Sequence, residues 1–235
     1  MIPWIASPHD FPPVEAARLE PNGLLCAGAN LAPATIIAAY SRGIFPWFSD
    51  DQPILWWSPN PRMVLLPAEF KISKSLAKTV ARGVFETRFD SAFGDVIAAC
   101  SAPRSKDGGT WIVPEMQAAY AQLHARGVAH SIESWRDGKL VGGLYGLALG
   151  RMFFGESMFA NETDASKVAL VALIDKLKRD GFELVDCQQE TRHLASFGAR
   201  PVPRGDFVQR LTELIDFNQS SSAWRASSPD KNVET

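Results

Sequence analysis

The chain has 235 residues, enough for one large domain or two unequal ones, and 46% of them are hydrophobic, which supplies a sizeable core. Its formal net charge of -2 lacks the basic balance typical of nucleic-acid-binding proteins, although a local basic patch is compatible with it. Three scattered cysteines (Cys26, Cys100 and Cys187) and four histidines show no CxxC or Cys/His ligand spacing, which argues against a disulfide framework and a zinc site.

The amino-terminal segment, MIPWIASPHDFPPVE, has no basic start and no long apolar stretch, so it does not read as a signal peptide. No apolar run approaches the ~18–20 residues that a membrane span needs. We therefore expect a protein of the reducing cytoplasm with no membrane partner.

Residues 1–62 are dense in proline and tryptophan, which predicts a small amino-terminal domain of short strands and ordered loops. One helix is expected over residues 33–41, where Pro33 suits the first turn and Gly43 follows the last. The remainder is predicted to form a larger catalytic domain over residues 63–218. A tail over residues 219–235, rich in Ser, Asp and Lys, is expected to be disordered.

A regular pattern begins at Met63, where MVLLP predicts a short strand and residues 71–82 predict a helix. Ile72, Leu76 and Val80 would face inward on this helix. The opposite face would carry four cations: Lys71, Lys74, Lys78 and Arg82. Such a stripe is either a solvated face or a set of phosphate contacts, because Lys and Arg on a helix neutralise a nucleic-acid backbone without reading bases.

Downstream, residues 114–126 predict a helix that Gly127 ends, and strands are expected over 128–135, 140–149 and 152–159. Asp137-Gly138 predicts a tight hairpin turn between the first two of these strands. A helix over 165–179, capped by Asp164 and ended by Gly181, would lead into a strand over 182–186. Antiparallel strands followed by a helix and a further strand predict an α+β fold with a mixed sheet.

Glu156 lies in an apolar strand segment, where a carboxylate must be paired or must border a cavity. Strict alternation would place Glu156 on the same face as Phe154 and Met158. Two readings stay open, a salt bridge to a structural arginine and a carboxylate of a functional site.

Asp186 and Gln188 follow an apolar strand, so Asp186 either caps the next turn or belongs to a site at the strand end. Between them, Cys187 is either a small buried hydrophobe or a nucleophile with His193 as its base. The glycines at 142, 143, 146, 150 and 155 match no phosphate-binding loop, and we expect them to relieve crowding in the hairpin.

Four segments together resemble one family, the bacterial leucyl/phenylalanyl-tRNA–protein transferases. They are GIFPWF (43–48), WWSPNPR (56–62), GLYGLALGRMFFGESMF (143–159) and Asp186-Cys187-Gln188. The resemblance spans roughly residues 20–199. It implies a fold similar to the acyl-CoA N-acyltransferase superfamily (GNAT-like) behind a small amino-terminal domain. It also implies transfer of Leu or Phe, with Met tolerated, from aminoacyl-tRNA to the amino-terminal Arg or Lys of acceptor proteins, which marks them for degradation.

The resemblance also implies roles for individual residues. Asp186 and Gln188 match the reactive centre of the family. Trp47 and Trp111 would flank the terminal adenosine of the tRNA, and the cations at 71, 74, 78 and 82 would contact its acceptor end. We further expect Leu144, Phe153 and Met158 to form the donor pocket, and Glu156 or Asp186 to meet the cation of the acceptor.

Because aminoacyl-tRNA is already an activated ester, the implied reaction needs no cofactor and no metal. Two other classes are kept open. A non-catalytic module that binds RNA ends would keep the aromatic and basic residues but would not need Asp186 or Gln188. An acyltransferase that uses CoA would need a pyrophosphate-binding loop, which the sequence does not show.

Overall fold

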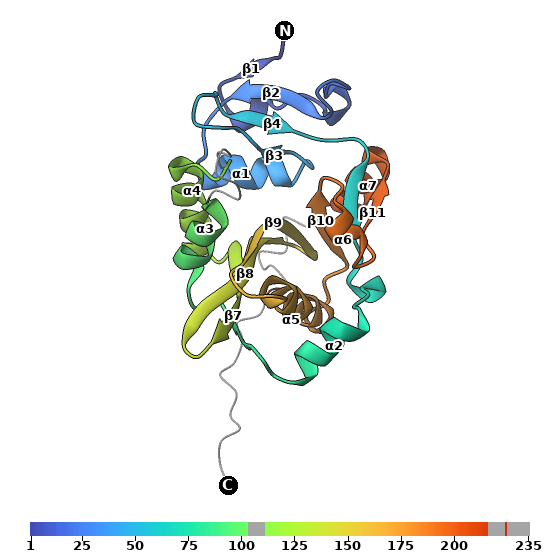
Figure 1. Cartoon of the computed structure of the whole chain (residues 1–235). Helices are drawn as coiled ribbons and strands as arrows, with labels where there is room; N and C mark the ends of the chain where they lie inside the picture. The colour runs from blue at the N-terminus through green and yellow to red at the C-terminus, as the bar shows by residue number, and fades with distance from the viewer. Residues whose placement is uncertain (103–110, 216–223, 225–235) are drawn as a thin grey trace.

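The computed structural model describes residues 1–102, 111–215 and 224, and it contains two sheets (Figure 1). The smaller sheet has the order β1-β2-β4-β3, and the larger one has the order β11-β5-β10-β9-β8-β7-β6. The strands of the small sheet are β1 (Trp4–Ile5), β2 (Leu24–Gly28), β3 (Phe45–Pro46) and β4 (Leu55–Trp57). Those of the large sheet are β5 (Arg62–Leu65), β6 (Glu86–Phe89), β7 (Ala129–Arg136), β8 (Lys139–Leu149), β9 (Met152–Ala160), β10 (Leu184–Gln188) and β11 (Arg200–Val202).

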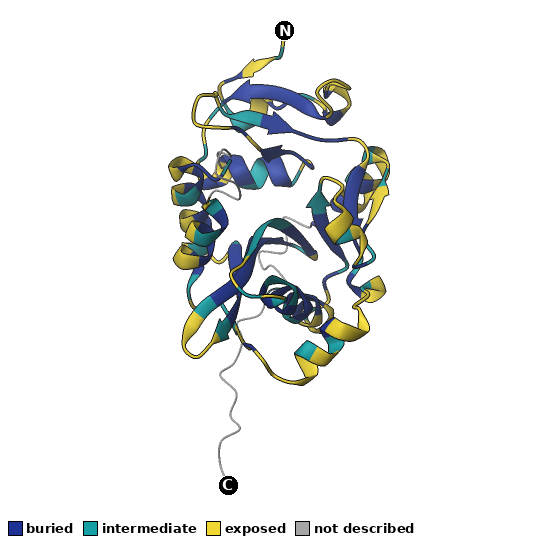
Figure 2. Cartoon of the chain, viewed as in Figure 1, coloured by how far each residue is buried: buried dark blue, intermediate teal, exposed yellow. Residues whose placement is uncertain are grey.

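Helices cover both faces of the large sheet. They are α1 (Pro33–Tyr40), α2 (Lys74–Ala81), α3 (Phe93–Ser101), α4 (Pro114–Ala125), α5 (Ala165–Asp180), α6 (Arg192–Ala195) and α7 (Arg204–Leu214), with short 3-10 turns at Pro8–Asp10, Val14–Ala16 and Pro67–Glu69. One core cluster joins α1, α3 and α4 to the sheet through residues such as Tyr40, Tyr120 and Phe154. A second cluster joins α5 to the other face through residues such as Phe153 and Ile174. Burial accordingly runs along the sheet and the inner sides of these helices (Figure 2).

The antiparallel hairpin and the helix that follows it confirm the expected α+β class. Strands β7, β8 and β9 run antiparallel, and β10 returns after α5 to lie parallel to β9. Asp137 and Gly138 both have positive φ, 50° and 71°, as the predicted tight turn requires. Gly181, at φ 80°, ends α5 as expected.

Some local predictions are wrong. Asp164 precedes α5 but makes no side-chain cap; its carboxylate instead accepts a hydrogen bond from Lys167 at 2.7 Å. Helix α2 begins at Lys74 rather than at Lys71, because the hydroxyl of Ser73 accepts the Leu76 amide at 3.2 Å and caps it there. Leu76 alone of the three apolar positions is buried, whereas Ile72 and Val80 are exposed.

The first 62 residues have a small core cluster of their own, with Ile5, Cys26 and Trp56 among its members, but they also contribute to the main core. Tyr40, Phe45 and Trp57 belong to the same buried cluster as Phe154 and Phe207 of the larger part. Strand β5 begins at Arg62, one residue before the predicted boundary, and pairs with both β10 and β11. Helix α1 therefore packs directly onto the face of the large sheet beside α4. The boundaries at 62 and 218 stay predictions, and the predicted tail lies outside the described residues except for Trp224.

Candidate active site

A cavity of about 430 Å³ lies where β9 and β10 separate. The two strands pair only as far as Phe154 and Asp186, and beyond that point Gly155, Glu156 and Gln188 line the cavity. An irregularity in β9 falls at the same place, because Gly146 of β8 faces Gly155 while Tyr145 faces Ser157. Gly146 permits this close approach, since a Cβ there would collide with the Phe154 carbonyl oxygen and the Phe153 ring.

The bulge corrects the predicted alternation of side chains along β9. Before it, Phe153 and Phe154 alternate between the two core clusters, as the sequence pattern indicates. After it, Glu156 reaches Tyr40 and Tyr120 on the face of Phe154, but Met158 packs against the opposite cluster. One extra residue shifts the phase of a strand, so Glu156 and Met158 do not share a face.

The apolar end of the cavity contains the three residues expected to form the donor pocket. Leu144, Phe153 and Met158 line it, and neighbouring strands and α5 add further aliphatic side chains: Leu65, Leu170, Leu173 and Val185. Trp47 and Trp111 line the same cavity from the segments after β3 and before α4. Trp47 is 38% exposed, so its indole is available for stacking.

Glu156 is the one carboxylate among the described residues that line the cavity. The hydroxyl oxygens of Tyr40 and Tyr120 lie 2.7 and 2.9 Å from its Oε1 and Oε2, and Gln188 donates from Nε2 to Oε1 at 2.9 Å. Burial raises the pKa of Glu156 to about 7, and the nearby charge of Asp186 acts in the same direction. Hydrogen bonds from Tyr40, Tyr120 and Gln188 oppose this rise. The open alternative of a salt bridge is wrong, because its partners are tyrosines and a glutamine.

Asp186 does not line the cavity. Its side chain has no exposed surface, and Arg62 donates to both oxygens, from Nε to Oδ1 at 2.8 Å and from Nη2 to Oδ2 at 2.7 Å. Oδ1 also accepts the backbone amide of Gln188 at 2.9 Å. Asp186 thus reaches the cavity only through Gln188, whose backbone has a φ of 61°. Such a conformation is strained for a residue other than glycine and persists only where the surroundings hold it.

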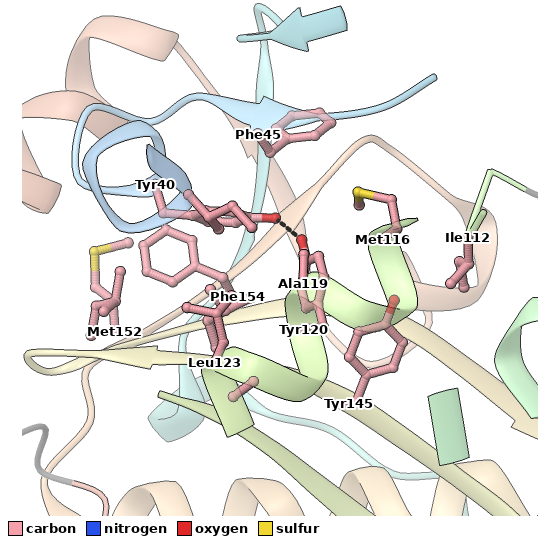
Figure 3. Packing of buried hydrophobic residues seen from close by; sticks show 14 of the residues in the cluster. Tyr40, Phe45, Ile112, Met116, Ala119, Tyr120, Leu123, Tyr145, Met152 and Phe154 are labelled. Carbon is pink, nitrogen blue, oxygen red and sulfur yellow. Dashed lines mark hydrogen bonds between the residues drawn. The ribbon is translucent and has the colours of Figure 1, made fainter. Parts of the chain in front are cut away.

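Arg62, Tyr40 and Tyr120 are site residues that sequence reasoning missed. The guanidinium of Arg62 lies over the rings of Phe45 and Phe207, at 4.9 and 4.7 Å, and donates to the Gly43 carbonyl at 3.1 Å. The chain has three tyrosines, and all three lie buried in one core cluster (Figure 3), where Tyr40 and Tyr120 contact Glu156. Tyrosine is rare in this chain, and all three tyrosines fall in segments that the sequence predicts to be helices or strands. This was the signal in the sequence that could have pointed to Tyr40 and Tyr120.

Cys187 and His193 both line the cavity, but the thiol is poorly suited to act as a nucleophile. Burial raises the pKa of Cys187, and the charge of Asp186 raises it further. Because the thiolate is the reactive form, these surroundings favour the interpretation of Cys187 as a packing residue.

The four cations of the expected basic stripe are exposed, but they do not all belong to one helix. Lys74 and Lys78 lie on α2, Arg82 follows its end, and Lys71 precedes its start, where its backbone amide donates to the Phe197 carbonyl at 2.9 Å. None of them lines the cavity. No helix among the described residues is long and apolar enough to cross a membrane.

Comparison with known proteins gives two family matches. Residues 64–212 match the family described as leucyl/phenylalanyl-tRNA protein transferase, and residues 29–60 match the description of the amino-terminal domain of the same proteins. The chain is 58% identical to a leucyl/phenylalanyl-tRNA–protein transferase of Aromatoleum aromaticum, over 95% of this chain and 94% of that one. It is 55% identical to the same-named protein of Nitrosospira multiformis, over 95% of this chain and 97% of that one.

Among solved structures, the chain is similar to L-PGS from Bacillus licheniformis, with 12% identity, a TM-score of 0.38 and coverage of 69% of this chain and 55% of that one. It is also similar to an aminoglycoside acetyltransferase, meta-AAC0020, with 14% identity, a TM-score of 0.38 and coverage of 65% and 98%. At this distance neither likeness bears on function.

Proposed function

The chain belongs to the leucyl/phenylalanyl-tRNA–protein transferase family, and on this premise we propose that it moves Leu or Phe, with Met tolerated, from aminoacyl-tRNA to the amino-terminal Arg or Lys of acceptor proteins. The enzyme is an aminoacyltransferase, and the products are proteins marked for degradation in the cytoplasm. The observation that carries the proposal is one cavity that combines an apolar end, two accessible indoles and a Glu156–Gln188 pair.

The donor side chain occupies the apolar end. This end presents an apolar surface, formed by Leu144, Phe153 and Met158, so the donor side chain needs no polar group there. The adaptable thioether of Met158 suits both a branched and an aromatic side chain. An apolar wall separates substrates that differ by one methylene by only ~1–3 kcal/mol. A pocket of this kind explains tolerance of Leu, Phe and Met better than strict selection of one.

The ester end of the substrate lies between the indoles of Trp47 and Trp111 and the polar pair. Stacking of a terminal base on an indole contributes ~1–3 kcal/mol and is indifferent to sequence. The cations at 71, 74, 78 and 82 contact phosphates farther along the acceptor end. Their placement outside the cavity agrees with a role in holding tRNA rather than in chemistry.

Gln188 and Glu156 face the reacting groups, whereas Asp186 acts as a positioning residue. The amide of Gln188 can donate to the oxygen on which charge develops when the amine attacks the ester carbonyl. Asp186 accepts the Gln188 backbone amide and is itself held by Arg62, so it fixes where that side chain points. Glu156 is the acidic side chain that the acceptor can reach, because Glu156 lines the cavity and Asp186 does not.

The test is a transfer assay with purified enzyme, Leu-tRNA and a peptide that begins with Arg, read by mass spectrometry. We expect one added leucine at the peptide amino terminus. The matched control is the same peptide with an acetylated amino terminus, which offers no nucleophile. Absence of transfer with a folded enzyme that binds the tRNA would support the RNA-binding class, and transfer from acyl-CoA instead would support the CoA-dependent class.

A further inference from the structure

Glu156, Tyr40 and Tyr120 form a closed triangle of hydrogen-bonding contacts. The hydroxyl oxygens of Tyr40 and Tyr120 lie 2.7 Å apart, and a dashed line in Figure 3 marks this hydrogen bond. Tyr40 Oη lies 2.7 Å from Oε1 of Glu156, and Tyr120 Oη lies 2.9 Å from Oε2. Each corner therefore contacts both of the others at hydrogen-bonding distance.

Counting protons shows that the tyrosines alone cannot supply these three contacts. A phenol carries one hydrogen, and an ionised carboxylate carries none. If both tyrosines donated to an ionised Glu156, the short contact between their own oxygens would hold no proton and would bring lone pairs together. A third proton removes this conflict, and the carboxyl is the group that can carry it.

We propose that Glu156 is held as the neutral carboxylic acid, in a ring of three hydrogen bonds with Tyr40 and Tyr120, and that it serves as the acid that protonates the departing ribose oxygen. This rests on the proposed function and deepens it. It also revises the expectation that Glu156 meets the acceptor's cation as a carboxylate. Tyr40 and Tyr120 are then positioning residues that hold the acid.

The surrounding contacts give the ring a direction. Oε1 accepts from Gln188 at 2.9 Å, which together with Tyr40 fills its two acceptor positions and leaves the acidic proton on Oε2. Oε2 then donates to Tyr120, Tyr120 donates to Tyr40, and Tyr40 donates to Oε1. Shifting all three protons one step along the ring reverses it, so the acid can present its proton from either oxygen.

The charged and titratable groups nearby favour the neutral form. Tyr40 from α1, Tyr120 from α4 and Tyr145 from β8 are all buried, and burial raises the pKa of each, so they keep their protons. Asp186 of β10 presents a negative charge, and its partner Arg62 of β5 hydrogen-bonds to Asp186 and not to Glu156. Burial raises the pKa of Glu156 to about 7, consistent with the count.

In the proposed reaction Glu156 both supplies the proton that the ribose oxygen needs and recovers the proton that the amine loses. The acceptor's α-amino nitrogen attacks the ester carbonyl carbon and forms the C–N bond, and the C–O bond to the ribose then breaks. The ribose oxygen takes the proton of Glu156, and the carboxylate that results takes the proton that the nitrogen releases. The enzyme returns to its starting state with no further reactant.

Infrared difference spectroscopy of wild type against Glu156→Gln reads the proton directly, in enzyme without substrates. We expect a protonated-carboxyl band, shifted in heavy water, that disappears with a midpoint near pH 7 and is absent from the variant. A wild-type spectrum with no such band above the usual glutamate range, about pH 4–5, would overturn the proposal. Tyr120→Phe takes away the acceptor of the acidic proton, so the carboxyl band should move to higher frequency; an unchanged frequency would contradict the ring.

Glu133 provides a matched control within the chain. This buried carboxylate accepts only, from the Ser91 and Ala92 amides, the Ser91 and Ser131 hydroxyls and the Trp135 indole. Glu133→Gln would point an amide donor at other donors and should lower the thermal midpoint clearly. Glu156→Gln reproduces the donor and acceptor of a neutral acid and should leave the midpoint unchanged at about pH 6. Equal losses in the two variants would overturn the proposal.

A leucine-transfer assay, combined with the infrared band, distinguishes failure of this inference from failure of the proposed function. If the band is present but wild-type enzyme transfers no leucine, the proton state stands and the function fails. If transfer occurs without the band, the function stands and the ring fails. With both present, Glu156→Gln should bind charged tRNA normally yet lose at least tenfold in single-turnover rate, and its rate should no longer fall on the alkaline side.

Discussion

Arg62 contacts both carboxylate oxygens of Asp186 in a pair with no exposed surface on either side chain. The pair connects β5 to β10 at the point where β10 leaves β9, beside the cavity. Its geometry shows how a carboxylate can act on the cavity lining without opening onto the cavity. Arg62 pairs with the charge of Asp186, Oδ1 of Asp186 also accepts the Gln188 amide, and this bond helps to hold the strained backbone of Gln188.

Replacing Asp186 should therefore impair both stability and turnover. Asp186→Ala leaves the guanidinium of Arg62 buried and unpaired, which typically costs about 3–5 kcal/mol in free energy of unfolding. We expect single-turnover transfer to fall far more than tRNA affinity, because Gln188 loses its position while the cations proposed to hold tRNA are untouched. Asp186→Asn, which keeps the shape and one acceptor, should be milder in both measurements. Normal turnover in a folded Asp186→Ala variant would remove Asp186 from the site.

Charge reversal at Lys74 and Lys78 on α2 should weaken tRNA binding and flatten its salt dependence. Each lost phosphate contact should lower the slope of log K against log salt by roughly 0.7–0.9. The ratio of Leu to Phe transfer should not change, because neither lysine lines the cavity. Reversal at exposed Lys139, in the β7–β8 hairpin, is the matched control. An unaltered slope would show that Lys74 and Lys78 are solvated and do not contact tRNA phosphates.

Stability should depend on pH through Glu156. Its pKa is raised from 4.5 to about 7 in the folded protein, so between these values the folded state binds a proton that the unfolded state has released. The stabilisation is fully present below the unfolded value and is lost as pH rises through about 7. At 1.36 kcal/mol per pKa unit the loss is of the order of 3 kcal/mol. Urea denaturation of wild type and Glu156→Gln across this range measures it, and parallel curves would contradict it.

Much of the fold follows from local sequence patterns. The hairpin turn at Asp137-Gly138, helix α5 and its end at Gly181 rest on signals a few residues long. Short elements without strong periodicity, such as β6, α3 and β11, were not predicted. The position of Glu156 could not be deduced either, because the bulge near Gly155 depends on pairing with Gly146 of another strand.

The site shows the same division. The residues in DCQ and GES were identified as candidates, but the partners that decide their roles come from distant segments. Arg62 lies 124 residues from Asp186, and Tyr40 lies 116 residues from Glu156. Contact between two buried residues so far apart in the chain produces no periodic pattern, so a single sequence does not reveal it. The sequence therefore indicated two candidate carboxylates, while the fold decides that Asp186 is paired with arginine and that Glu156 borders the cavity.

Trp224 should contribute to stability although it lies beyond the residues matched by the family. Its ring stacks on His130 at 4.2 Å and on Phe153 at 5.9 Å, and the ammonium of Lys176 lies 4.6 Å from its centroid. Trp224→Ala should cost roughly 2–3 kcal/mol, less than the ~3–5 kcal/mol of a fully buried site, because this side chain is partly exposed. Denaturant unfolding measures the cost. Trp224→Phe, which keeps an aromatic ring, should recover most of the loss, and an unchanged midpoint in the alanine variant would show that the contact contributes nothing.

Enlarging the apolar end of the cavity should shift the choice of donor. Leu144 and Met158 face each other across β8 and β9, and both line the cavity, so Met158→Ala or Leu144→Ala removes volume from one wall. Leu, the smaller donor, should lose contact with that wall, whereas Phe should lose less and a bulkier donor such as Trp should gain. A few methylenes change relative efficiency by about 10- to 200-fold, or ~1–3 kcal/mol.

The measurement is the ratio of kcat/KM for Leu-tRNA and Phe-tRNA, because a folding defect lowers both together and cancels. Val168→Ala is the matched control, since Val168 belongs to the same core cluster but does not line the cavity. If both pocket variants fold and keep the wild-type ratio, the donor side chain binds elsewhere.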